Sequence, residues 1–447
     1  MHKKFVIIGG DAAGMSAASK IKRMRPDAEL VVFEKGEFIS YAACGMPYWI
    51  SGVIDDGDKL QVLTPQIARE KRGIDVRIWH EVKKIDPENN RISVVDLKTG
   101  EKFEESYDAL LIATGARAVS PNIPGVELEG VFTLRNLAEG YIIKNYLADN
   151  EIKHATIIGG GYIGLEMAEA FRHRNIKVSM LIGRLARTFD EDILEKIADH
   201  IIEKGVDLQR DNKAVSIEKA ADQLLVKTLS GDVKTDIVIL STGVKPNSEM
   251  AEEAGIVLGK SGAITINSNM QTSIPNIYAA GDCVEHKHQI LEEDVWIPLA
   301  TSANKGGRVA GENMAGKPIS FPGILGTAVV KVFDYTMAQT GLAQKQAEMI
   351  TKYGEISTTM ITSESRAHYY PGSTPVTIKL VVEKSSKRLL GAQIIGKADV
   401  AKRVDVLATA ITAKMTVEDI GMLDLTYAPP ISPVYDPIHV AANVANK

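Results

Sequence analysis

A short apolar strand, a glycine-rich turn and a helix follow one another twice in this 447-residue chain, and this repeated unit constrains the fold most. The first copy has its strand at 5–8, its turn at 9–14 and its helix over about 13–25. The second has its strand at 156–158, its turn at 159–164 and a helix that ends near 172. Glycines at such a turn let a diphosphate approach backbone amides at a helix N-terminus, where the dipole favours anions. The sequence predicts an α/β fold with two Rossmann-type dinucleotide-binding domains.

The first copy departs from the ideal pattern at one position, because Asp11 stands where the middle glycine is expected. A strand over 30–33 then ends in Glu34, an acid placed to accept hydrogen bonds from a ribose. The alternative is that Glu34 is only the solvent-facing end of a strand. We expect nucleotide contacts in this copy from Gly9, Gly10, Ala13, Gly14, Glu34 and Lys35.

The second copy has the full glycine spacing but lacks the acid that usually follows the next strand, here predicted over 177–182. Gly183 occupies that place, and Arg184 and Arg187 follow it. A carboxylate there would repel a 2′-phosphate, whereas arginines can pair with one, so the pattern favours NADPH over NADH. Alternatively, the two arginines are solvated loop residues. The expected contacts are Gly159, Gly161, Tyr162, Ile163, Gly164, Glu166, Arg184 and Arg187.

Three further buried strands end in turns that favour a bound nucleotide. One runs to Thr114 and Gly115, a similar segment closes the second unit at Gly243, and a third ends in Gly281 and Asp282. Because ligands gather at the carboxyl ends of such strands, Asp282 can bind a polyol hydroxyl of FAD; its alternative role is a helix N-cap. A helix that starts near 298 would face the same flavin, which adds Pro298, Ala300 and Thr301 to the expected contacts.

Cys44 lies between these motifs and directly before a glycine, a methionine and Pro47, a sequence typical of a helix start. A thiol at a helix N-terminus has a lowered pKa and therefore more thiolate, although a small buried core residue is the alternative. Disulfide reductases with two cysteines commonly carry the second one five residues on, where this chain has Trp49. Cys283, the other cysteine, ends a buried strand and is expected to be inert. One reactive thiol predicts a mixed disulfide or a sulfenic acid as its oxidised form.

The composition sets limits on partners and location. The length predicts two or three domains, and a net charge of −5 gives no reason to expect nucleic acid or an acidic membrane surface. Two cysteines cannot form a disulfide framework, which favours the reducing cytoplasm. No apolar run approaches the roughly 20 residues that a membrane helix needs, and the N-terminus is too short in apolar residues for a signal peptide. We expect no metal site.

Basic residues on the first helix and near residue 70 form a possible rim for substrate phosphates, with a solvated face as the alternative. The expected substrate contacts are Lys20, Arg23, Ser40 and Lys71.

Three segments beyond the glycine motifs identify a family: 40–48 (SYAACGMPY), 367–372 (AHYYPG) and 426–437 (TYAPPISPVYDP). With them the chain resembles the pyridine nucleotide-disulfide oxidoreductases over residues 4 to about 445. Within that family it is similar to the single-cysteine group of coenzyme A-disulfide reductases, NADH oxidases, NADH peroxidases and persulfide or polysulfide reductases. The oxygen- and peroxide-reducing members carry a histidine where this chain has Ala12, which counts against those activities.

The resemblance implies FAD, NADPH or NADH, and a homodimer whose active site is shared between subunits. In coenzyme A-disulfide reductases, tyrosines of the partner's C-terminal domain act at the cysteine. Tyr427 matches one such position, and either Tyr369 or Tyr370 matches the other. The implied domains are FAD-binding (1–115 and 250–325), NAD(P)H-binding (116–249) and an α+β dimerisation domain (326–447).

The implied reaction is reduction of coenzyme A disulfide through Cys44, with coenzyme A held there as a mixed disulfide and Tyr427 as proton donor. A persulfide or polysulfide reductase would use the same residues, and an NADH oxidase is the less favoured enzyme. A flavoprotein redox sensor or electron-donating partner subunit is the non-enzymatic alternative.

Overall fold

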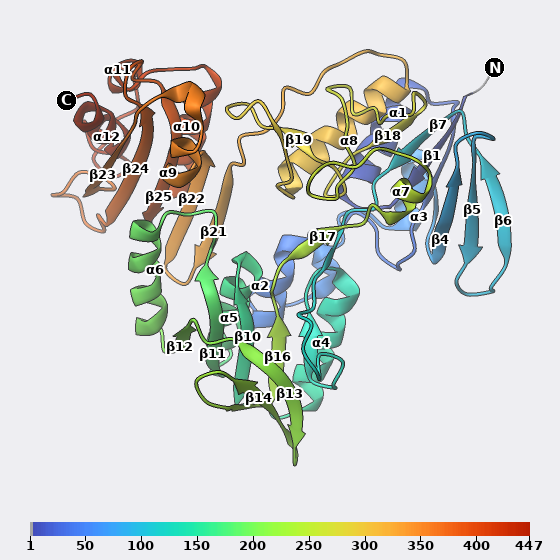
Figure 1. The fold of residues 1–447 in the computed structure, drawn as a ribbon, viewed down its shortest axis with the longest axis horizontal. Coiled ribbons are helices and arrows are strands. Elements are labelled where there is room, and N and C mark those ends of the chain that lie inside the picture. The colour runs from blue at the N-terminus through green and yellow to red at the C-terminus, as the bar shows by residue number, and fades with distance from the viewer. Residues whose placement is uncertain (1–2) are drawn as a thin grey trace.

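The computed structural model describes residues 3–447, which form three lobes (Figure 1). The first lobe is built on a five-stranded parallel sheet in the order β18-β7-β1-β2-β3. Since its strands come from both ends of a long stretch of chain, the second lobe is an insertion into the first. The strands are β1 (Lys4–Ile8), β2 (Glu29–Phe33), β3 (Asp75–Arg77), β7 (Ala109–Ile112) and β18 (Ile277–Ala279).

Two helices of the first lobe, α1 (Ala12–Met24) and α8 (Ala300–Met314), lie against each other. The contact is close because a Cβ on Gly307 would lie 2.2 Å from the carbonyl oxygen of Ala13. The opposite side of the sheet packs on the antiparallel strands β4 (His80–Asp86), β5 (Arg91–Asp96) and β6 (Lys102–Ser106). The remaining helices of this lobe include α2 (Met46–Ser51), α3 (Pro65–Arg72) and α7 (Glu249–Glu253).

The second lobe repeats the parallel architecture in the order β12-β11-β10-β16-β9. Its strands are β9 (Val131–Thr133), β10 (His154–Gly160), β11 (Lys177–Leu185), β12 (Val206–Arg210) and β16 (Ile237–Leu240). Helices α4 (Leu137–Asp149), α5 (Tyr162–His173) and α6 (Glu191–Glu203) cover it, and β13 (Ala214–Ala220), β14 (Gln223–Thr228) and β15 (Val233–Thr235) form a small antiparallel sheet. The pair β8 (Ala116–Ala118) and β17 (Val244–Pro246) joins this lobe to the first.

The third lobe is an antiparallel sheet in the order β21-β22-β25-β24-β23, with helices packed on it. The strands are β21 (Ala328–Val332), β22 (Tyr335–Gly341), β23 (Ile356–Glu364), β24 (Pro375–Glu383) and β25 (Leu389–Gly396). The helices are α9 (Gln344–Glu348), α10 (Val400–Thr412), α11 (Val417–Gly421) and α12 (Pro437–Ala445). The buried Lys379 fastens this lobe to the second, with its Nζ 3.1 Å from Asp190 and 2.8 Å from Asp192.

The glycine turns explain why the two repeated units fold as predicted. Gly9 has φ +105°, and a Cβ on Gly14 would lie 1.9 Å from the carbonyl oxygen of Gly9. Only glycine meets both demands, because one position is left-handed and the other has no room. Asp11 has φ −100°, a conformation open to any residue, so the missing middle glycine does not disturb the turn.

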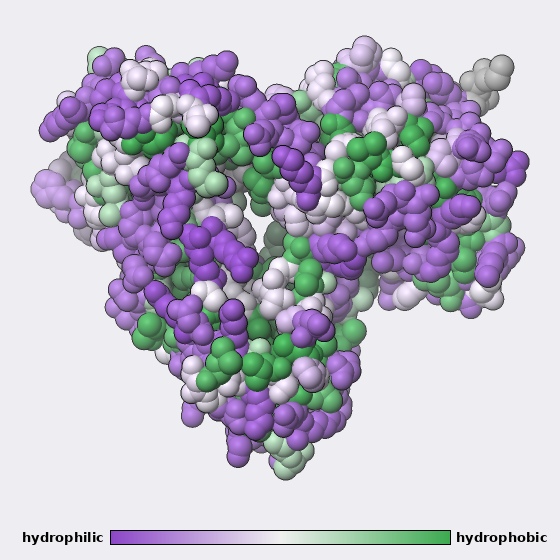
Figure 2. Space-filling model, in the orientation of Figure 1, coloured by the Kyte–Doolittle hydropathy of each residue, from purple (hydrophilic) through white to green (hydrophobic). Residues whose placement is uncertain are grey.

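The predicted α/β class with two Rossmann-type units and an α+β C-terminal region is confirmed. One strand differs from its predicted length, since β11 continues past residue 182 to Leu185, where it pairs with Gly160 after a bulge. Across residues 3–447, no helix combines the length and apolar character that crossing a membrane requires. The face shown in Figure 2 is mainly hydrophilic, with hydrophobic residues in separate small patches.

Candidate active site

Cys44 lies in a single 3-10 turn, Ala43–Gly45, that leads directly into α2. Pro47 falls in the first turn of α2, as the sequence predicts. Part of Cys44 is exposed, but surrounding protein atoms desolvate the thiol and raise its pKa, and Glu166 adds to this effect. The expectation of a lowered pKa is therefore wrong. Helix α2 has only six residues, too few to outweigh desolvation and nearby carboxylates.

The position of a second cysteine is closed off by packing. Trp49 is 4% exposed and meets Tyr141 edge to face, with ring centroids 4.7 Å apart. Cys283 is fully buried, and burial raises the pKa of its thiol. The described residues thus leave Cys44 as the accessible thiol of the chain.

Backbone and carboxylate groups converge at the carboxyl edge of the first sheet. Glu34 accepts hydrogen bonds from the amides of Gly10 at 2.8 Å and Gly36 at 2.7 Å, so it is half-buried rather than a solvent-facing strand end. Helices α1 and α8 both begin at this edge without a side-chain cap, which leaves their first N–H groups free for a diphosphate. The same edge carries Gly9, Ala13, Gly14, Lys35, Thr114, Gly115, Gly281, Asp282, Pro298, Ala300 and Thr301. These groups fit a dinucleotide such as FAD.

Two carboxylates at this edge have features that spacing did not reveal. Asp282 forms an ion pair with Arg135 of the second lobe and caps no helix, so the N-cap alternative is wrong. Asp11 is desolvated in the glycine turn, and with the charge of Glu34 this raises its pKa to about 6. A neutral Asp11 is compatible with a diphosphate placed nearby.

The second glycine turn has the same construction. Gly161 precedes α5 without a side-chain cap, and Tyr162, Ile163, Gly164 and Glu166 follow in its first turns beside Gly159. A Cβ on Gly183 would meet nothing within 4 Å, so that place is open. Both Arg184 and Arg187 are exposed, and Arg184 donates to the carbonyl of Phe189 at 3.0 Å. Gly243 lies where the chain crosses back toward the first lobe, and its carbonyl accepts from the amide of Val119.

Helix α5 also carries an acid toward the cysteine. Glu166 is buried enough that its pKa rises to about 7, mainly through desolvation and secondarily through Glu169. Since α2 and α5 lie side by side, this carboxyl of the second lobe influences Cys44 of the first (Figure 1).

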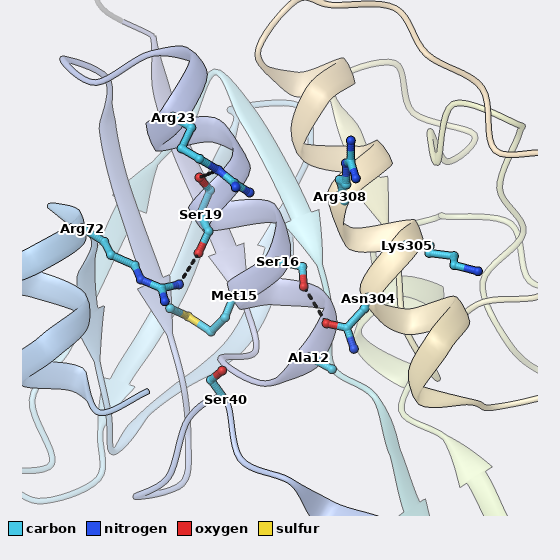
Figure 3. Close-up of a pocket in the computed structure, with 10 residues that line it drawn as sticks. All are labelled: Ala12, Met15, Ser16, Ser19, Arg23, Ser40, Arg72, Asn304, Lys305 and Arg308. Carbon is cyan, nitrogen blue, oxygen red and sulfur yellow. Dashed lines mark hydrogen bonds between the residues drawn. The ribbon is translucent and has the colours of Figure 1, made fainter. Parts of the chain in front are cut away.

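A pocket of about 410 Å³ opens between α1 and α8 next to the first glycine turn (Figure 3). Four of its lining side chains are cations, namely Arg23, Arg72, Lys305 and Arg308. The rest of the lining is Ala12, Met15, Ser16, Ser19, Ser40 and Asn304. Ser40 connects the pocket to the cysteine segment, and its amide donates to the carbonyl of Gly10 at 3.0 Å.

Two expected substrate residues do not line this pocket. Lys20 instead forms an ion pair with the buried Glu312 of α8 at 2.9 Å. Lys71 does not line the pocket, but its neighbour Arg72 does. Arg72 is the last residue of α3 and donates to Ser19 Oγ at 3.0 Å. Asn304, Lys305 and Arg308 also line the pocket and were not among the expected contacts, although the charges of Lys305 and Arg308 on either side of the helix-packing glycine Gly307 were a usable signal.

One contact distinguishes the two neighbouring tyrosines Tyr369 and Tyr370. The hydroxyl of Tyr369 lies 3.3 Å from that of Tyr427, whereas Tyr370, the next residue, makes no such contact. Tyr369 is 64% exposed and Tyr427 is 48% exposed, so the pair faces solvent on the third lobe. Sequence had left both neighbours open.

Comparison with protein-family models identifies the family of this chain. Residues 3–307 match the model of the pyridine nucleotide-disulphide oxidoreductases, and residues 327–437 match the dimerisation domain of the same family. The chain belongs to this family. As a member it is an oxidoreductase that uses FAD and NAD(P)H, which confirms the predicted cofactor classes.

Curated relatives point to sulfur chemistry. The chain is 42% identical over 447 residues to an NAD(P)H coenzyme A polysulfide/persulfide reductase of Pyrococcus horikoshii, covering 99% of this chain and 98% of that one. It is 33% identical over 433 residues to a coenzyme A disulfide reductase of Staphylococcus haemolyticus, covering 96% of each.

Solved structures show the same fold. A reduced CoADR-RHD protein of Bacillus anthracis matches with a TM-score of 0.96 and 38% identity, covering 100% of this chain and 80% of that one. An engineered water-forming NADPH oxidase bound to NADPH matches with a TM-score of 0.94 and 29% identity, covering 99% of this chain and 98% of that one. The substitutions in that oxidase, derived from a Lactobacillus brevis enzyme, remove an aspartate and introduce two arginines.

Proposed function

We propose that this enzyme uses NAD(P)H to reduce coenzyme A disulfide through Cys44. The observation that carries the proposal is the cationic pocket between α1 and α8, which adjoins both the first glycine turn and the cysteine segment. Coenzyme A carries several phosphates on one end and a thiol on the other. Arginines pair well with phosphates, so Arg23, Arg72 and Arg308 would hold the nucleotide end while the sulfur reaches Cys44.

The thiol chemistry follows from one cysteine. The Cys44 thiolate attacks one sulfur of coenzyme A disulfide, which breaks the S–S bond, leaves coenzyme A in a mixed disulfide and releases the other coenzyme A as a thiolate. Two electrons then reduce the mixed disulfide to the Cys44 thiolate and a second coenzyme A thiolate. FAD, when bound, carries these electrons from NAD(P)H. Because Cys44 has a raised pKa among its own neighbours, its thiolate depends on groups that bind beside it.

The coenzyme A thiolate released when Cys44 attacks the disulfide needs a proton, and Tyr427 of the partner subunit is the proposed donor, with Tyr369 beside it. A phenol O–H can pass its proton to a thiolate as a general acid. Both tyrosines are exposed on the lobe that matches the dimerisation domain. In a dimer, this lobe of one subunit would present their hydroxyls to Cys44 of the other subunit. The enzyme is thus proposed to be a homodimer with a shared active site.

NADPH is the proposed electron donor. The open place at Gly183 and the exposed Arg187 leave room and charge for a 2′-phosphate, and the engineered NADPH oxidase gained its arginines in a related scaffold. We assign FAD to 1–115 and 250–325, NADPH to 116–249 and dimerisation to 326–447, in a cytoplasmic enzyme.

A second candidate is reduction of a coenzyme A persulfide or polysulfide. It is favoured by the 42% identical relative and would use the same pocket and thiol. An NADH oxidase is disfavoured because Ala12, which lines the pocket, offers no proton donor to oxygen.

The test is anaerobic NADPH oxidation by the FAD-loaded protein with coenzyme A disulfide, then with coenzyme A persulfide. Cys44→Ser is the inactivating variant and Cys283→Ser is its matched control. Fast turnover that is lost only with Cys44→Ser supports the proposal. Turnover with the persulfide alone moves the assignment to the second candidate, and turnover with neither would overturn both and favour a redox sensor.

A further inference from the structure

Two separate loops carry the tyrosine pair of the third lobe. Residues 365–374 form a closed loop around Tyr369, because the Ser365 amide donates to the Thr374 carbonyl at 2.9 Å. Tyr427 lies in the segment between α11 and α12, where the Ser432 hydroxyl donates to the Thr426 carbonyl at 2.6 Å. Each loop is ordered locally, but these bonds do not set one loop relative to the other.

One buried guanidinium joins the bases of these loops. Arg403 on α10 is 5% exposed, and its Nη2 donates to the carbonyl of Ser365 at 2.9 Å. The same Nη2 donates to Asp436 Oδ2 at 2.8 Å, and Nε lies 3.0 and 3.1 Å from the two carboxylate oxygens. Asp436 also caps α12 by accepting from the Ile438 amide at 2.9 Å. Arg403 thus holds the start of one tyrosine loop and the end of the other.

The buried ion pair between Arg403 and Asp436 is better suited to fixing geometry than to adding stability. Burying two charges carries a large desolvation cost, so a buried ion pair adds little net stability over an apolar pair. It does fix geometry, because a bidentate guanidinium constrains direction as well as distance. Helix α10 is packed against β22 and β25, which gives the clamp a rigid base.

We propose that Arg403, together with Asp436, is a positioning residue that keeps the hydroxyls of Tyr369 and Tyr427 in register for proton donation. This rests on the proposed function of Tyr427 as the donor. Arg403 would touch neither substrate nor flavin and would act through the two loops. A small displacement of the donor lowers the rate of protonation, while the substrate pocket on the first lobe is unaffected.

The leaving thiol gives a readout that a general structural defect would not. A mixed disulfide of coenzyme A with an acidic aromatic thiol releases a thiolate that needs no proton to leave. Arg403→Lys keeps the charge beside Asp436 but lacks the fork that also reaches Ser365. We expect it to lower kcat for coenzyme A disulfide roughly tenfold or more, with little change in KM and little loss with the aromatic mixed disulfide.

Two controls complete the kinetic test. Lys402→Gln removes a 90%-exposed cation next to Arg403 on the same helix and should leave both rates unchanged. In a Tyr427→Phe background, Arg403→Lys should cost less than about twofold, because residues that act as a unit are not additive. Equal losses with both disulfides, or the same loss in both backgrounds, would overturn the proposal. Asp436→Asn serves as the second variant if Arg403→Lys does not fold.

A measurement without turnover separates this inference from the proposed function. Photo-oxidative cross-linking of the FAD-loaded protein should give a dityrosine signal that disappears in Tyr427→Phe and falls at least about threefold in Arg403→Lys, since the coupling needs close contact. If coenzyme A disulfide is not a substrate, this yield still decides whether Arg403 positions the pair. An unchanged yield in Arg403→Lys would refute positioning, whatever the substrate.

Discussion

The hydroxyl of Tyr369 lies 3.3 Å from the hydroxyl of Tyr427, although 58 positions of sequence separate the two residues. The hydrogen bond between the two hydroxyls, in which either can be the donor, raises the pKa of Tyr369. In the proposed function Tyr427 is the acid, and Tyr369 would orient its hydroxyl.

Replacement of the tyrosines should therefore give graded effects. Tyr427→Phe is expected to lower kcat for coenzyme A disulfide by about a hundredfold, the usual scale for losing a general acid. Tyr369→Phe should cost about tenfold or less, because it orients rather than donates. Tyr370→Phe is the matched control and should stay within about twofold of the parent. Steady-state kinetics checks the order, and equal effects at Tyr369 and Tyr370 would contradict it.

The pocket predicts a contrast between two neighbouring residues. Arg72→Ala should raise the KM for coenzyme A disulfide by about tenfold, the loss expected for one charge-assisted hydrogen bond to phosphate. Lys71→Ala removes the same charge from the adjacent position, which does not line the pocket, and should leave KM nearly unchanged. The KM values of the two variants, measured at low and high salt, show whether Arg72 binds the phosphate directly. An equal rise in both would mean that only the overall charge of this face counts.

Cofactor choice should depend on Arg187. Arg187→Ala is expected to raise the KM for NADPH by about tenfold and to leave that for NADH unchanged, because only NADPH carries the 2′-phosphate. Gly183→Asp should shift preference to NADH, since its carboxylate would repel the phosphate. Arg184→Ala is expected to have the smaller effect because Arg184 already binds the Phe189 carbonyl. Initial rates with both nucleotides test this, and a parent that prefers NADH would contradict it at once.

The buried His286 predicts a loss of stability in acid. Desolvation lowers its pKa to about 4, and both ring nitrogens lack hydrogen-bond partners in the described residues. The unfolded chain, with a histidine pKa near ~6.5, binds more protons than the folded one between these values. Stability therefore falls as the pH drops from about 6.5 toward 4, and the penalty is constant below that.

His286→Leu should flatten this slope in thermal unfolding of the FAD-loaded protein between pH 4 and 6.5. His288 is the comparison, since its pKa is also lowered to about 4 by burial, yet its Nδ1 accepts from the amide of Ile290 at 3.2 Å. His288→Leu should lower the free energy of unfolding at pH 7 by about 1–3 kcal/mol, because the amide of Ile290 loses its acceptor. Identical slopes for the parent and His286→Leu would show that other groups dominate acid unfolding.

The two glycine turns could be predicted from the sequence because their steric requirements are local. Gly9 and Gly14 satisfy a left-handed backbone and a contact too close for any Cβ, and neither demand depends on distant residues. For the same reason the second glycine turn and the helix start at Pro47 were predicted correctly. The presence of one thiol without a partner at Trp49 is also a property of the sequence itself.

The site required the tertiary structure, because charges and burial act through space. Glu166 reaches Cys44 from another lobe and helps to raise the thiol pKa that the local helix start was expected to lower. Glu312 of α8 takes Lys20 away from the pocket, and the last turn of α3 presents Arg72 instead of Lys71. The sequence by itself determined the two nucleotide-binding units and the lack of a second cysteine near Cys44, since backbone sterics and residue identity are local. Only the tertiary structure decided which cations and which tyrosine can act together, since that depends on contacts between residues far apart in the chain.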